Sequence, residues 1–165
     1  MTKDEIHLNN FTESLRLSQK MFNLGLLLSF FAVFVAFNPS DTAGQAKIPL
    51  LDIKIESKEG FLWITALFFM LVGIHMNFAI KRCFTTLKLI KNEDLSEAAK
   101  SYPSIINADF SYTVLMVATL SGAWAAAIVE TFSIEAFYAF IISQVIITPY
   151  IYGARKSKNI TPKTG

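Results

Sequence analysis

The sequence predicts an all-α integral membrane protein with four transmembrane helices and a short extracytoplasmic β element between the first two. Hydrophobic residues make up 53% of its 165 residues and charged residues only 17%, whereas soluble domains usually carry about 25% charged residues. The charges are clustered, and they leave four apolar stretches close to the roughly 20 residues that a helix needs to cross a bilayer. Between the first two stretches the pattern changes to the period-two alternation of a strand.

We expect the transmembrane helices at about 15–37, 61–80, 110–129 and 132–152, as one domain over 1–165. We interpret the first as a retained span, because its leading arm contains Asp4, Glu5 and Glu13, whereas a cleaved signal peptide has a short basic lead. The apolar region 110–152 is too long for one helix. Glu130 and Thr131 therefore mark a tight turn between two antiparallel spans.

The distribution of basic residues predicts the orientation. Twelve of the 15 Lys and Arg residues lie in the amino-terminal arm, the loop at 81–109 and the carboxy-terminal tail, and only three lie on the other side. Positively charged loops stay in the cytoplasm. We therefore expect both termini and the 81–109 loop to be cytoplasmic, with the 38–60 loop outside. Including the acidic residues, the inner side carries +5 and the outer side −3.

The outer loop contains the strand pattern, which runs from Ile53 to Ser57. Pro49 cannot donate to a ladder, so it lies either in an edge strand or at the first residue of a strand. A lone strand is unstable, so it must pair with the leg at 42–47, with the same segment of another subunit, or with an external chain. The predicted outer contact residues are the apolar ones, Ile48, Leu50, Ile53 and Ile55.

The cytoplasmic loop contains a predicted short helix that ends at Pro103. Asp94 and Glu97 resemble a capping box at its start, and Leu95, Ala98, Ala99 and Tyr102 form an apolar stripe along it. Two interpretations stay open: a surface helix lying at the lipid headgroups, or a platform on which a soluble cytosolic protein docks through that stripe.

The third span has a face of small residues. Ala118, Gly122 and Ala126 recur every four residues, a spacing that lets two helix backbones approach closely in lipid. The face is expected to pack either against the fourth span or against another copy of the chain. Trp124 points away from this line and is expected to face lipid or a partner.

Polar side chains inside the spans are candidate functional residues. His75 is the ionisable one, expected as a hydrogen-bonded structural residue or as a proton or ligand site. Gln144 lies near the middle of the bilayer, where an amide needs a partner, most simply across a helix interface. Pro149 is expected to kink the fourth span.

Several function classes find no support in the residues. The chain has no phosphate-binding loop, no H-E-x-x-H motif and a single cysteine, so we predict no enzyme activity, no cofactor and no metal. The basic cytoplasmic side is typical of an anchor beside anionic lipid, and we expect the bilayer rather than nucleic acid as its partner.

The outer segment also carries a resemblance. Residues 48–55 read IPLLDIKI, Phe61 then opens a span, and His75 lies deep within that span. This pattern resembles small four-span bacterial membrane proteins with an outer IPLL strand, such as the membrane subunit of the Kiwa anti-phage system. The resemblance covers about a fifth of the chain. It implies a subunit of the bacterial inner membrane that oligomerises, senses phage at the envelope and holds a cytosolic effector, and it assigns no functional residue.

Two functional hypotheses follow. The first is a non-enzymatic membrane scaffold or sensor subunit that forms a homo-oligomer and docks a soluble cytosolic effector, with a role in anti-phage defence. The second is a small oligomeric channel or transporter with a path lined by Gln144, Ser143, Thr148 or His75.

Overall fold

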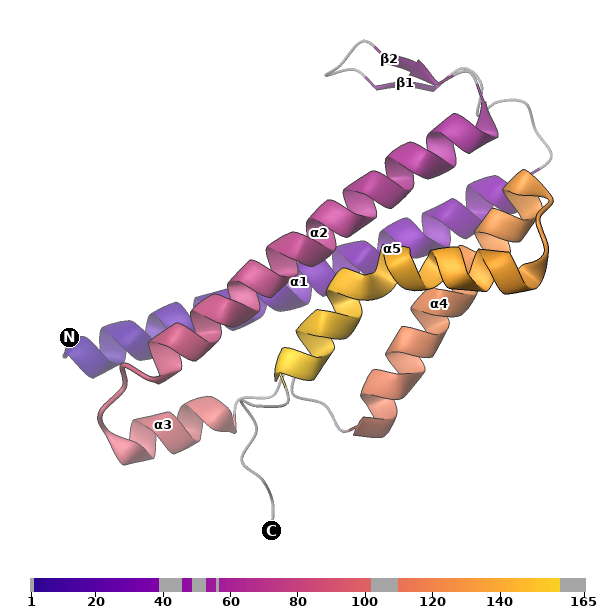
Figure 1. The fold of residues 1–165 in the computed structure, drawn as a ribbon. Coiled ribbons are helices and arrows are strands. Elements are labelled where there is room, and N and C mark those ends of the chain that lie inside the picture. The colour runs from indigo at the N-terminus through magenta and orange to yellow at the C-terminus, as the bar shows by residue number, and fades with distance from the viewer. Residues whose placement is uncertain (1, 39–45, 49–52, 56, 102–109, 158–165) are drawn as a thin grey trace.

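The computed structural model describes residues 2–38, 46–48, 53–55, 57–101 and 110–157. Its helices are α1 (Lys3–Phe37), α2 (Lys58–Leu87), α3 (Glu93–Lys100), α4 (Phe110–Phe132) and α5 (Ala136–Ser157). Four of them, all except α3, are long and apolar enough to cross a membrane. This confirms the predicted all-α membrane protein with four spans. Figure 1 shows α1 and α2 side by side, with α4 and α5 covering only one half of their length.

The first two helices are longer than the bilayer requires. Their 35 and 30 residues correspond to about 52 and 45 Å at 1.5 Å per residue, against a hydrocarbon core about 30 Å thick. Helix α1 therefore begins well before the span expected at about 15–37, which lies within it. Thr2 caps the helix, and its hydroxyl accepts from the Glu5 N–H while the Glu5 carboxylate accepts from the Thr2 N–H. The polar first half of α1 projects beyond the apolar spans (Figure 1).

The projecting ends of α1 and α2 form a small core of their own with α3. Ala99 of α3 is buried against Phe11 and Cys83. The Cys83 thiol donates to the Phe11 carbonyl over 3.8 Å, and the Asn92 N–H donates to the Asp4 carboxylate over 3.0 Å. We call this unit, residues 3–18 with 83–100, the projecting module.

The α4–α5 turn lies slightly later than expected. The helices end and begin at Phe132 and Ala136, rather than on either side of Glu130 and Thr131. Ser133 makes the turn in the left-handed region, with φ of 52°, a conformation that ends a helix.

The four-helix core is built around aromatic side chains. Tyr150 is buried, stacks on Phe69 with ring centroids 4.4 Å apart, and donates to the Phe69 carbonyl over 3.2 Å. Its ring fills space that two glycines leave. A Cβ placed on Gly25 or Gly73 would lie 2.6 Å from ring atoms of Tyr150. These glycines thus let α5 pack closely on α1 and α2.

Between α1 and α2 the chain forms two strands, β1 (Ala46–Ile48) and β2 (Ile53–Ile55). They are antiparallel, with Ile48 opposite Ile53 and Ala46 opposite Ile55. Three residues each make a marginal sheet, so an extracytoplasmic β element stays a prediction. Leu50 lies outside the described residues.

Candidate functional site

The small-residue face of α4 is largely uncovered. Ala118 and Gly122 are exposed, and Ala126 is half-buried. A Cβ added at Gly122 would meet nothing within 4 Å. Ala118 and Gly122 are therefore not packed against the fourth span, which was the first of the two alternatives for this face; they line an open groove beside it. Among the described residues, no helix makes the close approach to Gly122 that such a face permits.

A groove runs between this face and α5. It encloses about 520 Å³. Gln144 of α5 is half-buried in it, and its Nε2 lies 3.4 Å from the Ser143 hydroxyl oxygen, which is long for a hydrogen bond. The amide is therefore only weakly satisfied by its own chain. The groove is lined by Val114, Val117, Ala118, Ser121, Gly122, Phe140, Gln144, Ile151, Ala154 and Arg155.

The expectation that Trp124 faces lipid or a partner was wrong. Its side chain is fully buried, and its indole N–H donates to the Ser29 hydroxyl over 3.1 Å. Ser29 donates in turn to the Gly25 carbonyl over 2.9 Å. Trp124 thus ties α4 to α1, and its burial leaves the opposite face of α4, which carries Gly122, turned outward.

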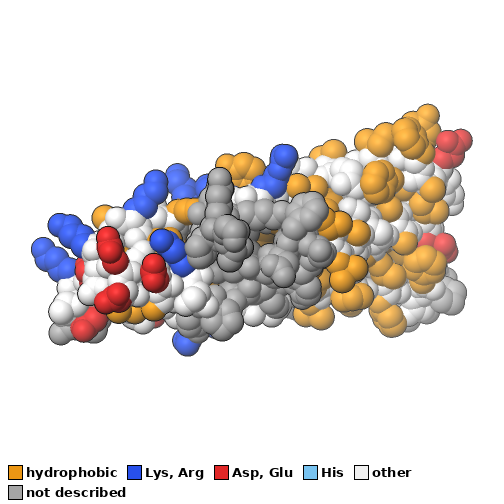
Figure 2. Space-filling view, turned by 90° about the horizontal axis from the view of Figure 1, so that it is seen from below, with side chains coloured by type: hydrophobic (Ala, Val, Ile, Leu, Met, Phe, Trp, Pro, Cys, Tyr) orange, Lys and Arg blue, Asp and Glu red, His pale blue; other side chains and the backbone are white. Residues whose placement is uncertain are grey.

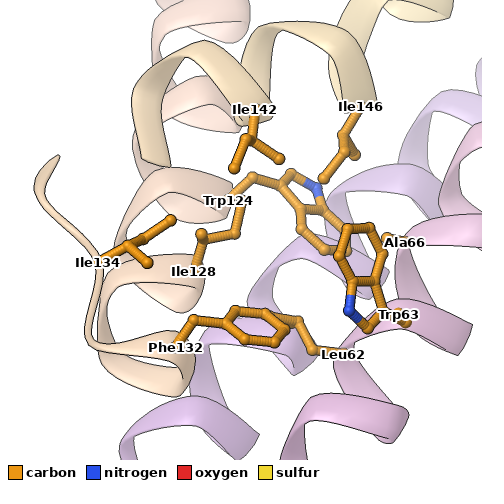
Figure 3. A pocket seen from close by; sticks show the side chains of 9 residues that line it. All are labelled: Leu62, Trp63, Ala66, Trp124, Ile128, Phe132, Ile134, Ile142 and Ile146. Atoms are coloured by element: carbon orange, nitrogen blue, oxygen red, sulfur yellow. The ribbon is translucent and has the colours of Figure 1, made fainter. Parts of the chain in front are cut away.

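Behind Trp124 lies a cavity of about 200 Å³ between α2, α4 and α5, with hydrophobic side chains pointing into it (Figure 3). Apolar cavities stay dry. The lining therefore offers water or an ion no polar partner. The lining residues are Leu62, Trp63, Ala66, Trp124, Ile128, Phe132, Ile134, Ile142 and Ile146.

The two candidate intramembrane polar residues are not brought together. His75 is exposed on the outer surface of α2 and does not line the groove that holds Gln144. Asn77 is instead the polar residue that joins two spans. Its Nδ2 donates to the Pro149 carbonyl over 2.7 Å and to the Gly73 carbonyl over 3.0 Å. This bond joins α2 to α5 beside Pro149. The carbonyl that the proline leaves without its helical donor is that of Val145, four residues earlier.

The predicted docking stripe on α3 faces inward. Ala99 is 1% exposed, and Leu95 packs on the same cluster against α1. These two residues face the module's own core and are not available to a soluble partner as expected, whereas Ala98 of the predicted stripe is exposed. Tyr102 lies outside the described residues. The true cap is Asn92, whose side chain accepts from the Leu95 N–H, rather than the Asp94–Glu97 pair. The exposed side of α3 carries Glu93, Asp94 and Glu97.

Charged and hydrophobic side chains divide the surface. Figure 2 shows Lys and Arg over one half of the molecule and hydrophobic side chains over the other, with acidic side chains near both ends.

Over the described residues, no three His, Cys, Asp or Glu side chains gather into a metal site. No protein-family model, curated protein or solved structure matches this chain.

Proposed function

We propose that this protein is a non-enzymatic membrane scaffold or sensor subunit. It self-associates through the α4–α5 groove and presents the projecting module to a soluble cytosolic partner. The observation that best supports this proposal is the uncovered groove between α4 and α5. In lipid, helices associate through small residues and interhelical hydrogen bonds, and the groove combines Ala118 and Gly122 with the weakly satisfied amide of Gln144.

The occupant that best fits the groove is α4 of a second copy. Two such faces meeting across a twofold axis would bring Gly122 against Gly122 and would give each Gln144 amide a partner in the hydrocarbon, where an unpaired amide is unfavourable. A lipid chain would cover the small residues but would leave the amide unpaired.

The projecting module supports the second half of the proposal. It has its own buried cluster and a hydrogen bond from Asn92 to Asp4, so its outer surface is held in one shape. A partner on α3 would meet the acidic side chains of Glu93, Asp94 and Glu97, and would itself be basic there. Both termini and this module lie in the cytoplasm of a bacterial inner membrane under this proposal. The resemblance noted above adds anti-phage defence as the process served.

Cysteine cross-linking tests the proposed contact between the Ala118–Gly122 faces of two copies, which we call the seam. The native Cys83 is buried, so the variants Ala118→Cys and Gly122→Cys each add one reactive thiol. In oxidised membranes we expect Gly122→Cys to form a covalent dimer, because a disulfide needs Cα atoms within about 7 Å. The matched control is Leu67→Cys, on an exposed part of α2. Equal cross-linking at Leu67, or none at Ala118 and Gly122, would count against the seam.

Replacing Gln144 with leucine distinguishes the scaffold hypothesis from the channel hypothesis. The change removes an interhelical hydrogen bond worth about 0.6 kcal/mol, so we expect dimer affinity in micelles to fall roughly threefold, with Val145→Leu, an exposed neighbour, unchanged. Flux across liposomes containing wild-type protein should equal that of empty liposomes. Solute or ion flux that Gln144→Leu alters would favour the channel hypothesis instead.

A further inference from the structure

A hollow lies at the basic end of the bundle, between the end of α2 and the end of α5. It encloses about 770 Å³. Three lysines converge on it: Lys81 of α2, Lys88 directly after the end of α2, and Lys156 of α5. The other lining residues are Phe84, Thr85, Leu87 and Leu89. The hollow is therefore cationic at its rim and partly apolar inside, and it lies apart from the α4–α5 groove.

Within the part of the chain that the structure describes, no carboxylate neutralises this positive charge. None of those residues brings a carboxylate into the lining of the hollow, and none pairs a carboxylate with Lys81, Lys88 or Lys156 within 4.0 Å. The Lys156 ammonium lies 5.5 Å from the centroid of the Tyr152 ring, which holds it beside the bundle. The Thr85 hydroxyl donates to the Lys81 carbonyl over 3.1 Å. The three ammonium groups are thus the donors available to a ligand.

A second basic hollow provides a contrast. It is lined by Arg16, Lys20 and Arg82, but Glu13 shares it. A carboxylate beside the cations offsets part of their attraction for an anion. The lysine hollow is the better anion site of the two.

An apolar stripe leads from the lysine hollow along α2. Leu67, Leu71, Ile74 and Phe78 are all exposed. They are followed on the same face, at spacings of three and four residues, by Lys81, Thr85 and Lys88. One face of α2 thus changes from hydrocarbon-compatible to cationic near the inner end of the span. A phospholipid has the same order, with acyl chains below a phosphate.

We propose that this hollow binds the phosphate headgroup of an anionic phospholipid, whose acyl chain lies along the α2 stripe. The lysines recognise the charge of the headgroup, and the stripe distinguishes a lipid from free phosphate. Lysine is a point-charge phosphate ligand, so the site selects net negative charge rather than one headgroup shape. The site does not depend on self-association at Gly122.

The test compares the full-length wild-type chain with the triple variant Lys81→Gln/Lys88→Gln/Lys156→Gln. Each protein is placed in nanodiscs of phosphatidylcholine with phosphatidylglycerol, extracted gently, and weighed by native mass spectrometry to count retained lipids. Wild type should retain phosphatidylglycerol over phosphatidylcholine. Each lysine removed should lower that retention roughly fivefold, the usual contribution of one basic residue near an anionic surface.

A charge-matched control is Lys3→Gln/Lys91→Gln/Lys100→Gln, which removes three lysines outside the hollow. Equal loss in both variants would show a diffuse charge effect and overturn the site. Loss of retained lipid on adding inorganic phosphate at equal concentration would show a phosphate site without lipid selectivity. If the triple variant fails to fold, Lys81→Gln alone and a photoactivatable phosphatidylglycerol probe replace it. Cross-links that avoid residues 81–89 and 156 would then contradict the proposal.

Discussion

Gly73→Leu is expected to prevent the four-helix bundle from forming. A Cβ at Gly73 would lie 2.6 Å from the Tyr150 ring and 2.8 Å from the Pro149 Cβ, and Tyr150 is held by its stacking on Phe69 and its hydrogen bond to the Phe69 carbonyl. The ring cannot move aside without losing both. Extra methylenes in a packed core usually cost about 1–3 kcal/mol, and here a whole side chain enters. We expect a loss of at least about 3 kcal/mol.

The measurement is thermal unfolding in detergent, at a dilution where the protein is monomeric. Gly122→Leu is the matched control, because a Cβ there meets nothing within 4 Å. It should leave the melting temperature of the monomer unchanged and weaken self-association instead. Similar melting temperatures for the wild type and Gly73→Leu would show that α5 does not pack on α2 as described.

Ala99→Glu should detach α3 from the projecting module while leaving the spans intact. Ala99 is 1% exposed among Phe11, Cys83 and Ile90, so a carboxylate there would be buried without a partner, at a cost of several kcal/mol. An isolated helix of eight residues is not stable in water. We expect limited proteolysis within 93–100 to accelerate on the order of tenfold or more, since each 1.4 kcal/mol corresponds to a factor of ten.

Ala98→Glu provides the control for this experiment, because Ala98 neighbours Ala99 on the same helix but is exposed. It adds the same charge at almost the same place. Equal proteolysis rates for the two variants would mean that α3 does not dock through Ala99. If a soluble protein co-purifies with the wild type, the amount that co-purifies with each of the two variants should be measured as well.

Some properties could be predicted from local sequence. The four spans follow from apolar runs such as 61–80, because transfer of side chains into hydrocarbon depends on composition over about 20 residues and little on their neighbours in space. The proline in α5 was also visible in the sequence as the expected kink. The hydrogen bond from Asn77 to the Pro149 carbonyl was not predicted, because the two residues are far apart in the chain and meet only where α2 and α5 cross.

The sequence alone was therefore enough to predict a membrane protein with four spans, and it identified a small-residue face on α4 and an apolar stripe on α3. Only the tertiary structure decided what those faces contact. Trp124 turns inward to Ser29 and leaves Gly122 uncovered, while Ala99 turns inward to Phe11 and is covered. Both stripes are apolar or small with helical spacing, so composition cannot distinguish them. The difference arises from side chains on α1 that are distant in sequence and decide by packing and hydrogen bonding which face is buried.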